Sequence, residues 1–139
     1  MSLAIASAID DAPAGAVLCL LTQYDIRQVK SEDFVPSEYA RIDFDAIRTA
    51  VALGIIVVEI AANGDNDLDD DRFTRRFDLS SRDSGAIMVA ATNGPLPTRA
   101  FFSNYGSRVD ANGWGDKVAT TGHGTSFSVP GDPLQRYIE

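Results

Sequence analysis

The sequence contains little of what disulfide bonding, imidazole chemistry or membrane insertion requires. Its 139 residues include one cysteine and one histidine. A single cysteine excludes an internal disulfide, and because Cys19 lies in an apolar run, we expect it to be a buried core thiol. No apolar run reaches the roughly 18 residues of a membrane-spanning helix. These absences leave a globular domain as the expected class.

Positive charge is also scarce. Twelve Lys and Arg residues face 20 Asp and Glu residues, which gives a net charge of −8 and a pI near 4.5. This balance disfavours nucleic acids and anionic membrane surfaces as partners. The chain starts without the basic and then apolar pattern of a signal peptide. We expect residues 1–3 to be a cloning leader and residues 4–139 to be a fragment of one larger domain.

Three apolar runs dominate the chain, at residues 16–21, 55–58 and 86–91. Each run is continuous and flanked by turn residues, which is typical of a parallel strand buried on both faces. Helical spacing predicts a helix over 3–11 and a second helix that Asp43 caps and Gly54 ends. Residues 24–40 are expected to form a long loop. The pattern predicts an α/β protein with a parallel sheet.

Residues 54–66 combine the second strand with a possible ligand site. The strand ends in Ala61, Ala62, Asn63 and Gly64. Open α/β sheets bind ligands at the carboxyl ends of their strands. Two alanines would leave room there, and Asn63 would offer an amide donor. The alternative is a core strand followed by an ordinary Asn-Gly turn.

This stretch resembles the oxyanion-asparagine segment of the subtilisin-like serine proteases, a valine-rich strand that leads into Ala-Ala-Gly-Asn. Ala62 stands where that family has glycine. Residues 101–110, with Phe-Ser-Asn-x-Gly and then an expected apolar-acidic strand, also match the family order, as do Gly113-Trp114-Gly115 and Thr120-Thr121-Gly122. The resemblance covers roughly residues 4–122.

The resemblance implies a three-layer α/β fold with a mostly parallel sheet and helices on both faces. It implies that Asn63 donates to the oxyanion formed during peptide-bond hydrolysis, and that a peptide or protein substrate binds along two short segments. These are Leu21, Thr22 and Gln23, and the wall formed by Ala61 and Ala62. No cofactor is required. Calcium is common in the family, and the acidic run 65–71 is the candidate loop, although a solvated loop is the simpler interpretation.

The catalytic triad of the family is not complete in this chain. The motif at 123–130 fits either the histidine motif, with His123, or the nucleophile motif, with Ser126, but not both. Our preferred interpretation is a variable loop, with the nucleophile beyond Glu139 and the acid and base before Met1. The fragment alone should then be inactive, exposed apolar sheet edges could drive self-association, and the parent protein would be exported. The alternative is a non-catalytic α/β binding or scaffolding module.

Overall fold

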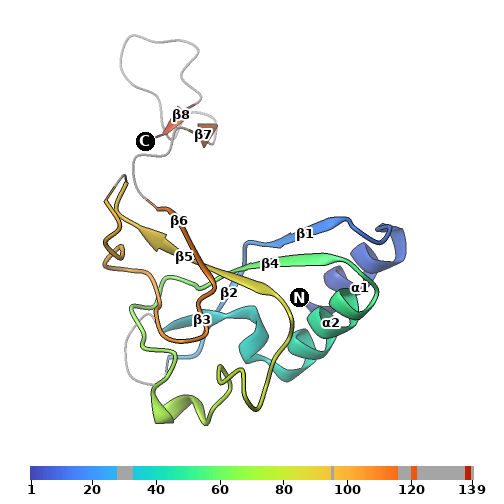
Figure 1. Cartoon of the computed structure of the whole chain (residues 1–139), viewed down its shortest axis with the longest axis horizontal. Coiled ribbons are helices and arrows are strands. Elements are labelled where there is room, and N and C mark those ends of the chain that lie inside the picture. Colours follow the sequence, from blue (N-terminus) through green and yellow to red (C-terminus); the bar gives the residue numbers. More distant parts are fainter. Residues whose placement is uncertain (28–32, 95, 116–119, 122–136, 139) are drawn as a thin grey trace.

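The computed structural model describes residues 1–27, 33–94, 96–115, 120–121 and 137–138. Its centre is a four-stranded parallel sheet with the order β1-β4-β5-β6 (Figure 1). The strands are β1 (Val17–Leu20), β4 (Ile56–Ile60), β5 (Ile87–Thr92) and β6 (Ala111–Trp114). The first three coincide with the three apolar runs, so the α/β class predicted from the sequence is confirmed.

Two α-helices, α1 (Ser2–Asp11) and α2 (Arg41–Ala52), precede β1 and β4. Helix α2 buries Phe44, Ile47 and Ala50, while Val51, which the helical spacing predicts on the same face as Phe44 and Ile47, is partly buried. Gly54 follows with a φ of +83°, a left-handed conformation that glycine adopts without strain. Neither helix is long and apolar enough to cross a bilayer, which holds for every helix of the described residues.

The predicted cap of α2 is wrong. The helix begins at Arg41 with Ala40 at the N-cap position, three residues earlier than expected, and Asp43 lies buried in its first turn. One carboxylate oxygen of Asp43 accepts a hydrogen bond from the hydroxyl of Tyr24 at 2.6 Å. This hydrogen bond, together with burial, raises the pKa of Tyr24 to about 12. Asp43 therefore ties the helix to the segment before it.

The helices and a group of aromatic side chains cover one face of the sheet. Ile47 of α2 and Ile5 of α1 pack against Val57 of β4 in one apolar cluster. A second cluster packs Phe73 and Phe77 against the same face of β4 and β5, further along the strands; it contains Val35, Ala61, Leu68, Phe73, Phe77, Met88 and Ala90. The core of the described residues therefore lies on this side of the sheet.

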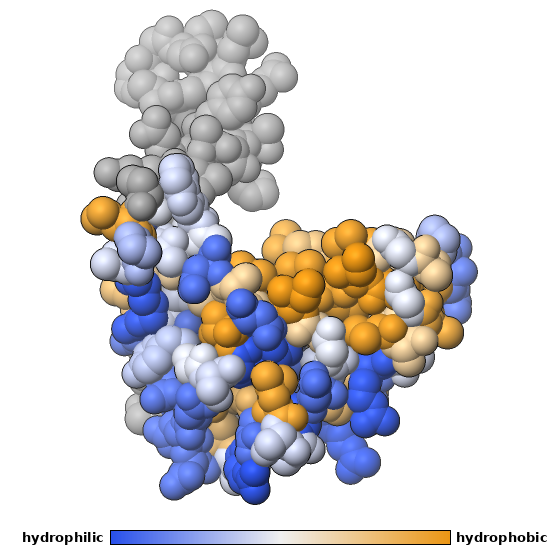
Figure 2. All heavy atoms as spheres, viewed as in Figure 1, coloured by the Kyte–Doolittle hydropathy of each residue, from blue (hydrophilic) through white to orange (hydrophobic). Residues whose placement is uncertain are grey.

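The opposite face of the sheet is open in the described part of the chain. Side chains alternate between the two faces of a strand. On this face the side chains at the strand starts are exposed, Val17 to 64%, Ile56 to 46% and Ile87 to 42%, and those further along β4 and β5 are partly buried. Figure 2 shows the apolar residues gathered over β1 and β4. The expected helices on both faces are thus found on one face only, and the described residues form two layers instead of three. Cys19 belongs to this open face and is exposed, so the prediction of a buried thiol is wrong.

The segment expected to be a long loop contains further elements. Strands β2 (Gln23–Asp25) and β3 (Phe34–Pro36) pair antiparallel, and a 3-10 turn, η1 (Ser37–Tyr39), leads into α2. Two further elements lie outside that segment. A second 3-10 turn, η2 (Asp71–Phe73), carries Phe73 of the second apolar cluster, and β7 (Thr120–Thr121) pairs antiparallel with β8 (Tyr137–Ile138). The apolar-acidic segment at 108–110 is not a strand, because β6 begins at Ala111. The resemblance therefore placed this strand a few residues too early.

Candidate active site

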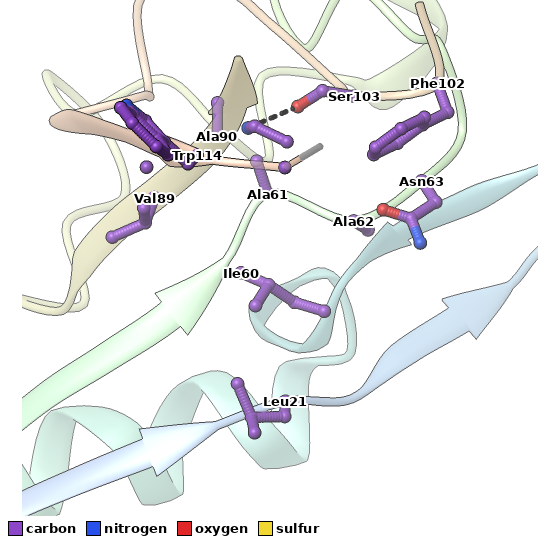
Figure 3. Close-up of a pocket in the computed structure, with 13 residues that line it drawn as sticks. Leu21, Ile60, Ala61, Ala62, Asn63, Val89, Ala90, Phe102, Ser103 and Trp114 are labelled. Atoms are coloured by element: carbon purple, nitrogen blue, oxygen red, sulfur yellow. Dashed lines mark hydrogen bonds between the residues drawn. The ribbon is translucent and has the colours of Figure 1, made fainter. Parts of the chain in front are cut away.

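A pocket of about 420 Å³ lies at the carboxyl end of the parallel sheet. Its walls come from the ends of all four strands and from the loop after β5, and they are mostly apolar or small (Figure 3). The residues are Leu21, Ile60, Ala61, Ala62, Asn63, Val89, Ala90, Ala91, Phe102, Ser103, Gly113, Trp114 and Gly115. This is the position in which α/β sheets bind ligands.

Four of the six site residues predicted from the sequence line this pocket: Leu21, Ala61, Ala62 and Asn63. Thr22 does not; its hydroxyl lies 2.9 Å from that of Ser37. Gln23 does not line the pocket either, but its side-chain Oε1 accepts the backbone N–H of Asn63 at 2.9 Å. The structure thus brings the two predicted segments together, through a side-chain contact that the sequence did not indicate.

Asn63 presents its side chain at the mouth of the pocket. It is exposed, and its side-chain amide forms no hydrogen bond with the residues that the structure describes. A neutral amide in this position can donate to a carbonyl oxygen that gains negative charge. The geometry therefore allows the donor role that the resemblance implies.

Ala62, directly before Asn63, has a φ of +73°. The left-handed region costs an L-residue with a Cβ roughly 1–2 kcal/mol, whereas glycine adopts it freely. This is the position at which the resembled family has glycine. The strained alanine keeps the glycine-like backbone turn beside the candidate donor.

Gly64, directly after Asn63, leaves no space for a side chain. A Cβ on this residue would lie 2.1 Å from the carbonyl oxygen of Phe34 and 2.4 Å from Nδ2 of Asn66. Neither atom can yield easily, because the carbonyl is backbone and the asparagine is buried. Glycine is therefore required at position 64 by the close packing of the loop against β3.

Asn104 is the residue of this site that the sequence did not single out. It is fully buried, and its side chain makes four hydrogen bonds, two of them to Gly64 and Ala61 of the loop that carries Asn63. The residue belongs to the Phe-Ser-Asn-x-Gly motif, which was matched only as a family pattern. That motif was the available signal, but nothing in it indicated a contact with residues 61–66.

Ser103 carries the one hydroxyl group among the described residues that line the pocket. Its Oγ accepts the N–H of Ala91 at 2.9 Å and donates to the carbonyl of Asn104 at 3.0 Å. The side chain is 1% exposed, so it holds the loop and is not presented to a ligand. None of the described lining side chains titrates, so this part of the pocket can orient and polarise a carbonyl but supplies neither nucleophile nor base. His123 and Ser126 lie outside the described residues.

Most carboxylates of the acidic run 65–71 bond to other groups of the protein itself. Asp65 pairs with Arg99 at 2.7 Å, Asp69 accepts from the backbone and hydroxyl of Ser107, and Asp70 caps η2. Within the described ranges, no group of three or more His, Cys, Asp or Glu side chains is arranged to hold a metal ion. The run therefore acts in the structure as a set of hydrogen-bond acceptors for loops.

A buried charge network lies beneath the pocket, on the helix-covered face of β4. Glu38 and Arg108 form an ion pair of 2.7 Å with both side chains at most 1% exposed. Glu59, four residues before Asn63, accepts the N–H of Glu38 at 2.8 Å. Burial, and then the charge of Glu38, raises the pKa of Glu59 to about 8. Glu59 is therefore mostly protonated at neutral pH.

Comparisons with protein-family models, with curated proteins and with solved structures gave no match. The functional argument consequently depends on the residues and the geometry described above.

Proposed function

We propose that this chain is part of a subtilisin-like serine endopeptidase domain in which Asn63 is the oxyanion donor. The observation that carries the proposal is the position of Asn63: an exposed amide at the carboxyl end of a central parallel strand, beside a pocket of small residues. The backbone turn at Ala62, where the family has glycine, supports it. The proposal includes the three-layer fold, with further helices over the open sheet face.

The reaction would proceed through an acyl-enzyme. A serine hydroxyl, deprotonated by a histidine, attacks the scissile carbonyl, and Asn63 donates to the oxygen that becomes negatively charged. Collapse of this intermediate expels the amine, which takes up the proton, and water then releases the acid. Peptide would lie between Leu21 and the Ala61-Ala62 wall. Because His123, the one histidine of the chain, shares its motif with Ser126 and only one of the two roles can be filled there, the 139-residue chain alone should not hydrolyse peptides.

The second candidate is a non-catalytic peptide-binding or scaffolding module. It is favoured by the absence of a titratable side chain among the described pocket residues, and by a strained alanine in place of glycine. Such a module would use the same pocket to hold a peptide without cleaving it.

A fluorophosphonate probe distinguishes these candidates in the natural gene product that contains this chain. Modification of a serine that follows Glu139, located by peptide mass spectrometry, is expected; Asn63→Ala should slow it about 10²–10³-fold, the range found when a subtilisin loses its oxyanion asparagine. Asn112→Ala, at an exposed asparagine of β6 that does not line the pocket, is the matched control. Modification of Ser126 would place the nucleophile within this chain. Folded protein that is not modified at all would refute the peptidase and leave the binding module.

A further inference from the structure

Asn104 holds the loop at residues 61–66 from both sides of Asn63. Its Nδ2 donates to the carbonyl of Ala61 at 2.7 Å, and its Oδ1 accepts the N–H of Gly64 at 3.0 Å and of Asn66 at 2.9 Å. Its own backbone N–H donates to the carbonyl of Ala62 at 3.0 Å. Asn63 is therefore flanked on either side by residues that one buried side chain fixes.

The fourth hydrogen bond of the Asn104 side chain connects the loop at residues 61–66 to β3. Nδ2 of Asn104 also donates to the carbonyl of Phe34 at 2.9 Å. The side chain thus uses both of its donor hydrogens and accepts two hydrogen bonds at its oxygen, which is its full capacity. An aspartate of the same shape would place a carboxylate oxygen against two carbonyl oxygens. An alanine would remove a hydrogen bond from the Ala61 carbonyl and from the N–H groups of Gly64 and Asn66, whereas the Phe34 carbonyl would keep Nδ2 of Asn66 as its donor. Asparagine is the side chain that satisfies all four.

This arrangement also accounts for the strained backbone. A non-glycine residue stays in the left-handed region only where its surroundings impose that conformation. The two carbonyls on either side of the Ala62 Cα, those of Ala61 and Ala62, both accept from Asn104. The backbone conformation of Ala62 sets the direction in which the chain continues to Asn63. Hydrogen bonds that fix the Ala62 backbone therefore also orient the Asn63 side chain.

We infer that Asn104 is a positioning residue that holds the backbone of Asn63 so that its amide faces the pocket. This inference rests on the proposed function, since it assigns Asn104 to the oxyanion site of that reaction. It acts only through Asn63 and does not touch the substrate.

The first test uses the 139-residue chain and needs no activity. Amide hydrogen exchange of Gly64 is measured in Asn104→Ala and in the control Asn66→Ala, relative to the Val58 amide of the central strand β4, which we expect to exchange through global unfolding. Asn66 is also buried, but its side chain bonds to Asp33, Phe34 and Arg72 and not to the backbone at 61–64. Exchange of Gly64 should rise about tenfold or more in Asn104→Ala only. Equal exchange in the two variants would overturn the inference.

The second test measures fluorophosphonate acylation in the natural gene product. Asn104→Ala should slow acylation about tenfold or more, while Asn66→Ala leaves it close to the wild-type rate. The double variant Asn63→Ala/Asn104→Ala should be no slower than Asn63→Ala alone, because Asn104 acts through Asn63. If the double variant were slower than Asn63→Ala by the same factor that Asn104→Ala loses in the wild type, the inference would be overturned. If the wild-type protein is not acylated, the proposed function fails, and the exchange test still decides whether Asn104 fixes the loop.

If Asn104→Ala does not fold, Asn104→Asp is the variant to use in both tests. Its carboxylate can still accept from Gly64, so this amide should remain protected, while the lost donation to Ala61 slows acylation. Unchanged acylation in this variant would count against a positioning role.

Discussion

The free energy of unfolding should decrease as the pH rises from 5 to 8, because Glu59 is held protonated inside the core and ionises readily only in the unfolded chain. Its side chain is 0% exposed, and its Oε2 has no hydrogen-bond partner among the described residues. Burial, and secondarily the nearby Glu38, raises the pKa of this carboxyl from 4.5 to about 8. An ionised Glu59 would be a buried charge whose neighbour carries the same sign.

The sign of the effect follows from proton binding. Between pH 4.5 and 8 the folded state retains a proton on Glu59 that the unfolded state has released, so the free energy of unfolding decreases with rising pH. The contribution is fully present below about pH 4.5 and is lost as the pH passes through 8. One group of this kind gives a slope of about 1.4 kcal/mol per pH unit, or at most about 5 kcal/mol over the whole window.

Urea unfolding at half-unit steps from pH 5 to 8.5 measures this slope in the wild-type chain and in Glu59→Gln. Glutamine keeps the acceptor for the Glu38 N–H and cannot ionise, so the variant should lose the Glu59 part of the slope and become the more stable protein at pH 8. Asp10→Asn, at an exposed acid of α1, controls for the change in net charge. Parallel pH profiles for the wild type and Glu59→Gln would refute the reasoning.

Three further predictions concern the loop and the open face. Ala62→Gly should be about 1–2 kcal/mol less destabilising than Ala61→Gly, since both remove a buried methyl group but only the first relieves a positive φ; equal losses in chemical denaturation would contradict this. Gly64→Ala should destabilise the chain by more than about 2 kcal/mol, because its Cβ would lie 2.1 Å from a backbone carbonyl oxygen; unfolding at the wild-type midpoint would contradict it. The open sheet face should drive reversible self-association of the 139-residue chain, so Ile56→Lys should lower the mass seen by light scattering while Ile42→Lys, at a 65% exposed position of α2, should not. A wild-type chain that stays monomeric at high concentration would exclude this association.

The sequence determined the class of the fold and three of the four strands of the parallel sheet, β1, β4 and β5. Runs such as 16–21 and 86–91 are continuous and apolar, and a parallel strand is the element that accommodates them. Helix α2 could also be predicted, because Phe44, Ile47 and Val51 recur at the helical period, and the structure buries the first two. These features depend on residues that are close together in the sequence, so they can be predicted from the sequence alone.

The candidate site was readable only in part. Asn63 and its neighbouring alanines could be located because they directly follow a strand, and the ends of parallel strands meet at one edge of the sheet. Asn104 could not be assigned a role, because it lies 43 residues from Ala61 and 40 from Gly64. Its function depends on β3, β4 and the loop before β6 meeting at one point, which no sequence pattern specifies.

Tertiary structure alone decided which face of the sheet is covered. A continuous apolar run is the same whether helices lie on one side of it or on both, so Cys19 looked buried and is exposed. The same holds for Glu59, a charged residue in an apolar strand, which lies buried against Glu38 of η1 and the Glu38–Arg108 ion pair. Periodicity fixes the element and the alternation of its side chains; the partner packed against each face fixes burial, pKa and the geometry of the site.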